Sequence, residues 1–77
     1  MHEFHIALHS VRQVQDFVSL AMAQPFEVTV GNDSQSISGK DLMGMFSLDL
    51  TVPVCVQAIC SQEEFSSFRT AAARFAV

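Results

Sequence analysis

The sequence has few basic residues. Its 77 residues include four lysines and arginines (Arg12, Lys40, Arg69 and Arg74) against eight aspartates and glutamates, and the net charge at pH 7 is −4. A protein that binds nucleic acid neutralises several phosphates with such side chains. We therefore expect no nucleic-acid binding.

Long apolar runs are also missing. The start, Met-His-Glu-Phe-His, has neither the cationic segment nor the apolar stretch of a secretory signal. No segment approaches the ~18 apolar residues that cross a bilayer. The sequence therefore predicts a cytoplasmic protein without membrane association.

Cysteine is scarce, with Cys55 and Cys60 as the only two. On one strand, five positions at ~3.3 Å each would hold their backbones far beyond the ~7 Å that a disulfide tolerates. We expect both to be reduced, buried packing residues. Since His2, His5 and His9 have no zinc-binding spacing with them, we also expect no metal site and no cofactor.

The apolar residues that are present suffice for one small core. Hydrophobic residues make up 49% of the chain and include seven phenylalanines, which argues against disorder. A domain of this size buries only about 60% of its extended-chain surface, so its stability should be modest. We expect one domain over residues 1–77, as a monomer or weak dimer.

The first half of the chain predicts a strand over 3–9, a helix from Ser10 to about Ala23, and strands over 26–30 and 35–38. Ser10 and Gln13 form a capping-box signature. The turn at 31–34 consists of residues that tolerate positive φ, and the polar strand after it suits a sheet edge. The residues expected to face the core are Phe4, Ile6, Leu8, Val11, Val14, Phe17, Val18 and Ala21.

Residues 40–50 predict a short amphipathic helix and its exit. This helix has too many large apolar residues to bury them all: Leu42, Met43, Met45, Phe46 and Leu48. Some of them should therefore face outward as a docking surface. Asp41 stands at the first turn, where free N–H groups and the helix dipole favour a carboxylate.

The last third predicts a strand over 51–60 and a helix from Ser61 to the end. The strand is apolar on both parities, so we expect it inside the sheet, with Pro53 at its entrance. Ser61 and Glu64 form a second capping box, and phenylalanines follow at helical spacing. An outer face carrying Ala7, Cys55 and Ile59 could pair two copies.

The order β-α-β-β-α-β-α and the stretch Gly39-Lys40-Asp41-Leu42-Met43-Gly44-Met45-Phe46-Ser47-Leu48 resemble HPr, the histidine-containing phosphocarrier family of the bacterial phosphoenolpyruvate:sugar phosphotransferase system. Its members carry a Lys-Ser-Ile-Met-Gly-Ile-Met-Ser-Leu type segment there. Phe17-Val18 stand at the family's separation from this segment without a gap. The resemblance implies an α+β open-faced β-sandwich, with three helices on one face of a four-stranded antiparallel sheet.

The residues of the family's chemistry differ in this chain. The family's active site reads Gly-Leu-His-Ala-Arg-Pro at the start of the first helix, where the histidine accepts phosphate and the arginine stabilises it. In gapless register from Phe17, Ser10 stands at the histidine position, Arg12 at the arginine and Gln13 at the proline. The resemblance therefore implies a non-enzymatic protein that has lost phosphotransfer.

Asp41 stands at a regulatory position of the family. In Gram-positive members a serine there is phosphorylated, after which the protein binds a catabolite-control transcription repressor. Asp41 carries a permanent charge, smaller than that of phosphate. We expect binding of a transcription regulator or a phosphotransferase-system component through Lys40, Asp41, Leu42, Met43 and Phe46, with Ser10 and Arg12 at the edge.

Two alternatives stay open at the start of the first helix. In a register shifted by one residue, His9 would be the phosphoacceptor, although Arg12 would no longer stand beside it. Alternatively, Ser10, Arg12 and the first helical N–H groups could bind a small anion. The simplest interpretations are that Ser10 is a helix N-cap, His9 a strand-end residue facing water and Asp41 a helix-start acid.

Overall fold

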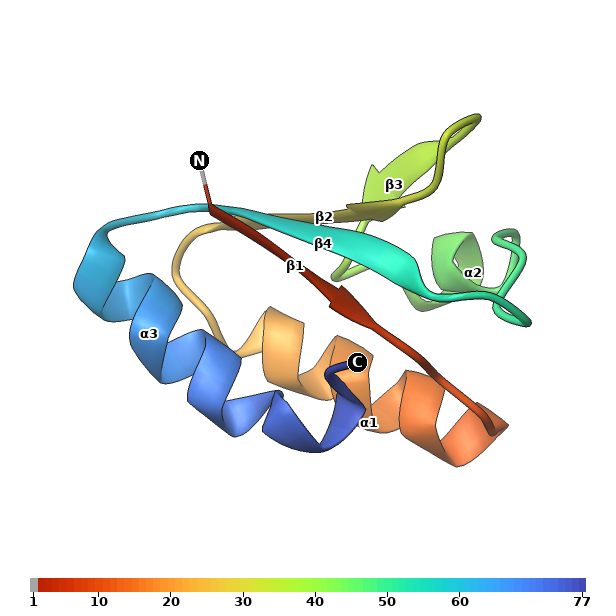
Figure 1. The fold of residues 1–77 in the computed structure, drawn as a ribbon, viewed down its shortest axis with the longest axis horizontal. Helices are drawn as coiled ribbons and strands as arrows, with labels where there is room; N and C mark the ends of the chain where they lie inside the picture. Colours follow the sequence, from red (N-terminus) through yellow and green to blue (C-terminus); the bar gives the residue numbers. More distant parts are fainter. Residues whose placement is uncertain (1) are drawn as a thin grey trace.

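The computed structural model describes residues 2–77. Four strands form one antiparallel sheet in the order β1-β4-β2-β3. Helices α1 and α3 cover the same face of the sheet and leave the other face open, and α2 lies against α1 and β3 (Figure 1). The α+β open-faced β-sandwich with three helices is confirmed. The elements are β1 (His2–Ile6), α1 (Val11–Met22), β2 (Glu27–Gly31), β3 (Ser36–Ser38), α2 (Leu42–Met45), β4 (Val54–Ile59), α3 (Gln62–Ala71) and the 3-10 turn η1 (Ala73–Phe75).

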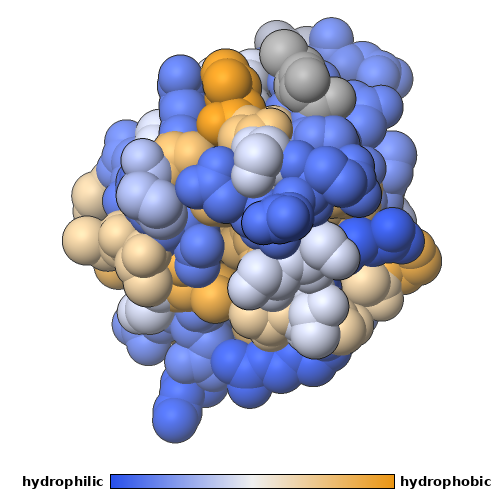
Figure 2. Space-filling view, turned by 90° about the vertical axis from the view of Figure 1, so that its left-hand side faces the viewer, coloured by the Kyte–Doolittle hydropathy of each residue, from blue (hydrophilic) through white to orange (hydrophobic). Residues whose placement is uncertain are grey.

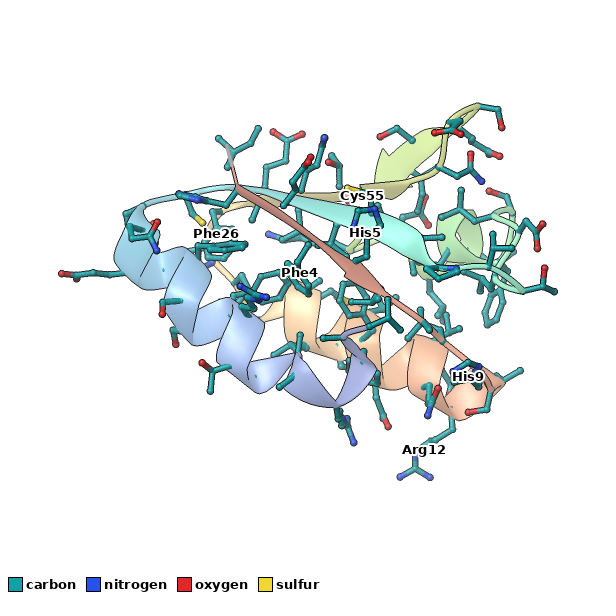
Figure 3. The ribbon with its side chains drawn as sticks, in the orientation of Figure 1. Phe4, His5, His9, Arg12, Phe26 and Cys55 are labelled. Atoms are coloured by element: carbon teal, nitrogen blue, oxygen red, sulfur yellow. The ribbon has the colours of Figure 1, made fainter. Side chains whose placement is uncertain are left out.

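The core lies between the sheet and the helices, and phenylalanine rings form its centre. The Phe68 ring is 5.9 Å from that of Phe4, 6.3 Å from Phe17 and 5.7 Å from Phe26, measured between ring centroids. Phe4 and Phe26 lie in the layer between sheet and helices (Figure 3). Most of the predicted inward residues are buried, because strand alternation and the helical period both point them at this layer.

Val11 is the exception among the predicted core residues, because its side chain is 60% exposed. It is the first residue of α1 and lines a surface groove with Phe46 and Leu50. The helical period gave the correct face for Val11, but the core does not extend to the first turn of α1. The prediction that Val11 is buried was therefore wrong.

Side-chain caps fix both long helices. Ser61 Oγ accepts the Glu64 N–H at 3.1 Å, and Glu64 Oε1 accepts the Ser61 N–H at 3.0 Å, so the capping box is complete. At α1, Ser10 Oγ accepts the Gln13 N–H at 3.1 Å. The capping box of α1 is incomplete, because Gln13 Oε1 accepts the N–H of His9 at 2.7 Å and not the N–H of Ser10.

The β2–β3 turn closes without positive φ, which no residue in the range 2–77 adopts. Asn32 Oδ1 instead accepts the N–H groups of Ser34 and Gln35, each at 3.0 Å. These side-chain bonds add to the backbone bond from the Asn32 N–H to the Gln35 carbonyl at 2.9 Å, so the predicted turn forms without the positive φ expected for it. As expected, β3 lies at the edge of the sheet.

β4 pairs with strands on both sides, as predicted for an interior strand. Val54, Val56 and Ala58 point into the core. The other apolar residues of the strand, Cys55 and Ile59, therefore lie on the outer face. Cys55 and Cys60 are free thiols and partly exposed, so the prediction that they are buried was wrong.

The expected apolar patch on the outer sheet face does not form. Polar residues stand beside Cys55 on that face: Glu3 and His5 in β1, Gln57 in β4 and Thr29 in β2. Ile59 is 52% exposed at one end of it. Apolar contact through this face therefore offers little area for pairing two copies.

The chain after α3 does not continue as a helix to its end. The Ala7 N–H donates to the Phe75 carbonyl at 2.8 Å, and the Val77 N–H donates to the His5 carbonyl at 3.2 Å. This segment covers part of the outer edge of β1. Within the described residues, no helix is long and apolar enough to cross a membrane.

Candidate functional site

The start of α1 is built around a capping serine. Because Ser10 Oγ accepts the Gln13 N–H, its hydroxyl oxygen satisfies one of the unpaired N–H groups of the first turn. The φ and ψ of Ser10, −151° and 161°, are the extended values of an N-cap. The structure thus gives Ser10 the simplest of the roles expected for it.

Arg12 points away from Ser10 toward the next turn of α1. Its Nε lies 3.5 Å from Asp16 Oδ1, and Arg74 Nη2 lies 3.5 Å from Asp16 Oδ2. The Arg12 side chain is 84% exposed and extends away from the helix (Figure 3). One carboxylate therefore offsets part of the positive charge of two guanidiniums, and Ser10 and Arg12 are directed to different partners.

His9 lies immediately before the capping serine. It is exposed, its backbone N–H donates to Gln13 Oε1, and it lines the groove at the start of α1. Its place in the chain agrees with the expected solvent-facing residue at the end of the first extended segment.

The short helix α2 presents apolar side chains to solvent. Met43 is 80% exposed and Phe46 is 45% exposed, whereas Met45 and Leu48 are buried in the core. Leu42 is partly buried and packs against the core. As expected, some of the five apolar residues face outward, and these are Met43 and Phe46.

Asp41 caps α2. Its Oδ1 accepts the Gly44 N–H at 3.1 Å. A Cβ at position 44 would lie 2.9 Å from Asp41 Oδ2, so glycine allows this close approach. Lys40 is directed elsewhere, because its Nζ donates to the Gln24 carbonyl at 2.9 Å near the end of α1.

An apolar groove separates the start of α1 from the loop after α2. It has a volume of about 360 Å³ and is lined by Leu8, His9, Ser10, Val11, Val14, Phe46, Leu50 and Thr51. The docking patch is our name for the exposed side chains of Val11, Met43 and Phe46 together with the partly buried Leu50. Asp49, which precedes Leu50 in the chain, accepts hydrogen bonds from the Thr51 hydroxyl and N–H, which lower the pKa of its carboxyl.

The end of the molecule opposite the groove has a surface of mixed polarity. Figure 2 shows hydrophobic and hydrophilic residues interspersed there. Met22, at the far end of α1, is 64% exposed but lies outside the groove. Exposed apolar residues are thus not confined to the docking patch, but among them only Val11 and Phe46 line the apolar groove.

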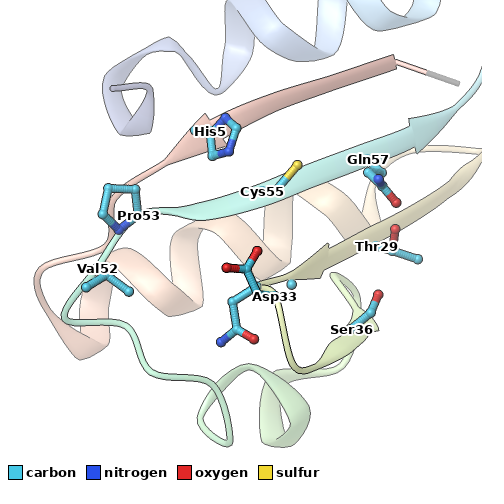
Figure 4. Close-up of a pocket in the computed structure, with 10 residues that line it drawn as sticks. His5, Thr29, Asp33, Ser36, Val52, Pro53, Cys55 and Gln57 are labelled. Atoms are coloured by element: carbon cyan, nitrogen blue, oxygen red, sulfur yellow. The ribbon is translucent and has the colours of Figure 1, made fainter.

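A second hollow lies on the open face of the sheet and was not predicted from the sequence. It has a volume of about 350 Å³, and its lining comes from β1, β2, β3, β4 and two loops (Figure 4). No group of three or more His, Cys, Asp or Glu in residues 2–77 could hold a metal ion.

No family model and no curated protein matches the chain. Among solved structures it is similar to the crystal structure of HPr-C-His from Thermoanaerobacter tengcongensis, with a TM-score of 0.76 over 96% of this chain and 92% of that chain. The chain has the HPr fold. Since only 24% of the residues are identical, the similarity shows the fold, and the activity must be argued from this chain's own residues.

Proposed function

We propose that this chain is a cytoplasmic, regulatory HPr-like protein that binds another protein through the docking patch and has lost phosphotransfer. The observation that carries the proposal is the combination of a capping serine at the start of α1 with an exposed apolar surface beside it. In the gapless register with HPr, that serine stands at the phosphoacceptor position.

The charges around the α1 start support the loss of phosphotransfer. A phosphorylated side chain carries close to two negative charges and needs a donor beside it. Here the Arg12 guanidinium, which stands at the matching position, contacts the Asp16 carboxylate instead. Ser10 has its oxygen engaged by the helix backbone.

The exposure of Met43 and Phe46 supports protein binding. Burying one such side chain fully is worth about 1.5–3 kcal/mol, so leaving both in water forgoes stability that a partner could recover. Aromatic residues and methionine are enriched in protein interfaces, and methionine adapts to different partner surfaces. The apolar groove beside Phe46 would accept an apolar side chain of the partner.

Asp41 supports a regulatory role for the same surface. Its Oδ1 is used as a helix cap, and its side chain is exposed next to Leu42 and Met43. The partner would read a fixed charge there, where Gram-positive HPr proteins present a switchable phosphate. The candidate partners are a transcription regulator and a protein of the phosphotransferase system.

The first experiment compares partner capture by the wild type, Met43→Asp and Met22→Asp. Both substitutions place a charge at an exposed methionine, but Met22 is the last residue of α1 and lies outside the docking patch. We expect Met43→Asp to lose a protein that the wild type and Met22→Asp retain. Equal capture by all three proteins would show that the docking patch is not the binding surface.

The second experiment tests phosphotransfer. Purified protein incubated with phosphoenolpyruvate and the general phosphotransferase enzyme should gain no phosphate, measured by phosphorus NMR and intact mass. The rival function, a phosphocarrier in shifted register, is favoured by the exposed position of His9 on the groove. A phosphohistidine that His9→Ala removes would establish the rival and refute our proposal.

A further inference from the structure

The hollow on the open sheet face is shaped by strand register. In one row across the sheet, His5 pairs with Cys55, Cys55 with Gly31, and Gly31 with Ser36. The side chains of His5, Cys55 and Ser36 lie on the open face (Figure 4). Gly31, which also lines the hollow, has no side chain to cover its floor.

Gly31 is required by the close approach of the next strand. A Cβ at position 31 would lie 2.4 Å from the Gln35 carbonyl oxygen and 3.0 Å from the Ser36 Cα. These neighbours are backbone atoms and cannot move aside as a flexible side chain would. The same glycine therefore permits the β2–β3 turn and keeps the hollow open.

The walls contribute polar groups that the protein itself does not use. His5, Thr29, Asp33 and Ser36 come from four segments, and no side-chain hydrogen bond or ion pair within residues 2–77 involves them. Convergent polar groups of this kind orient small ligands. The hollow thus has unused hydrogen-bonding capacity directed at one space.

Neighbouring side chains hold the remaining wall in place. Glu3 Oε2 accepts from Gln57 Nε2 at 3.2 Å and from Cys55 Sγ at 3.7 Å. Since the Gln57 amide nitrogen is engaged, its carbonyl oxygen is the atom available to a ligand. Desolvation, together with the negative charge of Glu3, raises the pKa of the Cys55 thiol, which stays protonated at neutral pH.

The charged residues around the hollow indicate the sign of the charge that a ligand would carry. Asp33 is in the lining and Glu3 stands behind it, whereas no lysine or arginine is among the lining residues. The lining therefore offers a carboxylate to a cation but no lysine or arginine to an anion. Val52 and Pro53 add an apolar wall on one side.

We infer that this hollow binds a small organic cation that carries an ammonium group next to hydroxyl groups. The ammonium pairs with the Asp33 carboxylate, the hydroxyls bond to Thr29, Ser36 and the Gln57 carbonyl, and the carbon skeleton packs on Val52 and Pro53. The hollow shares no residue with the docking patch, so this inference stands or falls independently of the proposed function.

The test is a titration of the 15N-labelled protein followed by two-dimensional NMR. The probes are 2-aminopropane-1,3-diol and glycerol, which differ by one ammonium in place of one hydroxyl, and inorganic phosphate. We expect the amino diol to shift the amides of Gly31, Ser36 and Cys55 in a saturable manner, and glycerol and phosphate to cause no saturable shift there.

Matched variants identify the counter-charge. Because exposed ion pairs contribute up to about 1 kcal/mol, Asp33→Asn should raise the dissociation constant about three- to fivefold. Glu63→Gln, which removes an exposed acid on α3, should leave it unchanged, and Thr29→Val should weaken binding without removing a charge. Equal binding of glycerol, shifts spread over all acidic residues, or unchanged affinity in Asp33→Asn would overturn the inference.

Discussion

Replacing Ser10 tests whether the residue that our proposal places at the phosphoacceptor position is a structural cap. Ser10→Ala removes the oxygen that accepts the Gln13 N–H at 3.1 Å and leaves that donor to water. Loss of an N-cap costs typically about 1 kcal/mol. In a domain of 60–100 residues, 1 kcal/mol lowers Tm by roughly 4–8 °C.

The assay is thermal unfolding followed by far-UV circular dichroism, with two reference variants. Ser10→Asp keeps a cap oxygen and adds a charge that the helix dipole favours, so its Tm should stay at or above that of the wild type. Ser61→Ala removes the cap of α3 and should cost a similar amount, since the bond lost there is also 3.1 Å.

Repeating the scans with phosphate separates a cap from an anion site. A ligand at 100 times its dissociation constant would stabilise the folded protein by about 2.7 kcal/mol. If Ser10 only caps α1, phosphate should change the Tm of wild type and Ser10→Ala equally. A Tm of Ser10→Ala equal to that of the wild type, or a phosphate effect that vanishes with Ser10, would refute the reasoning.

Three further predictions follow from the core and from the shifted pKa values. Phe68→Ala should destabilise the protein by about 3–5 kcal/mol in urea titration, because this 1% exposed ring contacts three others; a cost below about 1 kcal/mol would contradict the ring cluster. In a variant lacking the other cysteine, Cys55 should react slowly with a disulfide reagent at pH 8, and Glu3→Gln should lower its pKa and speed the reaction; an unchanged rate would exclude Glu3 as a cause. The Asp49 carboxyl has a lowered pKa when folded, so its stabilisation is complete above the unfolded pKa of about 3.9 and is lost as pH falls toward the folded value. Thr51→Val should therefore reduce the fall of Tm with acidification between pH 5 and 2, and an identical pH profile would contradict that role.

The sequence predicted the fold because the apolar periods of its elements agree with one another. The alternation in β1 and the helical spacing in α1 and α3 each pointed residues at a common layer, and the Ser61 capping box marked the start of α3. Val11 was misplaced because a periodic pattern gives the direction of a side chain but not the extent of the core beside it.

β4 shows a second limit of sequence patterns. When both parities of a strand are apolar, alternation cannot say which set faces the helices. The structure resolves this by pairing: β1 and β2 present polar residues beside Cys55 and Gln57, so that face is open to water. The sequence therefore predicted an apolar outer face where a largely polar hollow exists.

More of the docking patch than of the hollow on the open sheet face can be predicted from the sequence. The docking patch comes mainly from one contiguous stretch, so α2 could be recognised before its neighbours were known. The Arg12–Asp16 pair is likewise readable at helical spacing, but the contact of Arg74 with the same carboxylate depends on how α1 and the segment after α3 pack. The hollow is assembled by strand register from four strands and two loops, and no local sequence pattern marks it.

The docking patch and the start of α1 are held in place by different residues. Ser10 contributes one hydrogen bond to α1, from the Gln13 N–H to its side-chain oxygen. Met45 and Leu48, which are 0% and 6% exposed, fix α2 and the residues after it to the core. The orientation of Met43 and Phe46 thus depends on core packing and on the Asp41 cap rather than on the residue at position 10. If so, Ser10→Ala should lower Tm yet bind the partner with unchanged affinity, while Asp41→Ala, which frees the Gly44 N–H, should weaken binding. Loss of binding in Ser10→Ala at a temperature where it is fully folded would show that the α1 start is itself part of the interface.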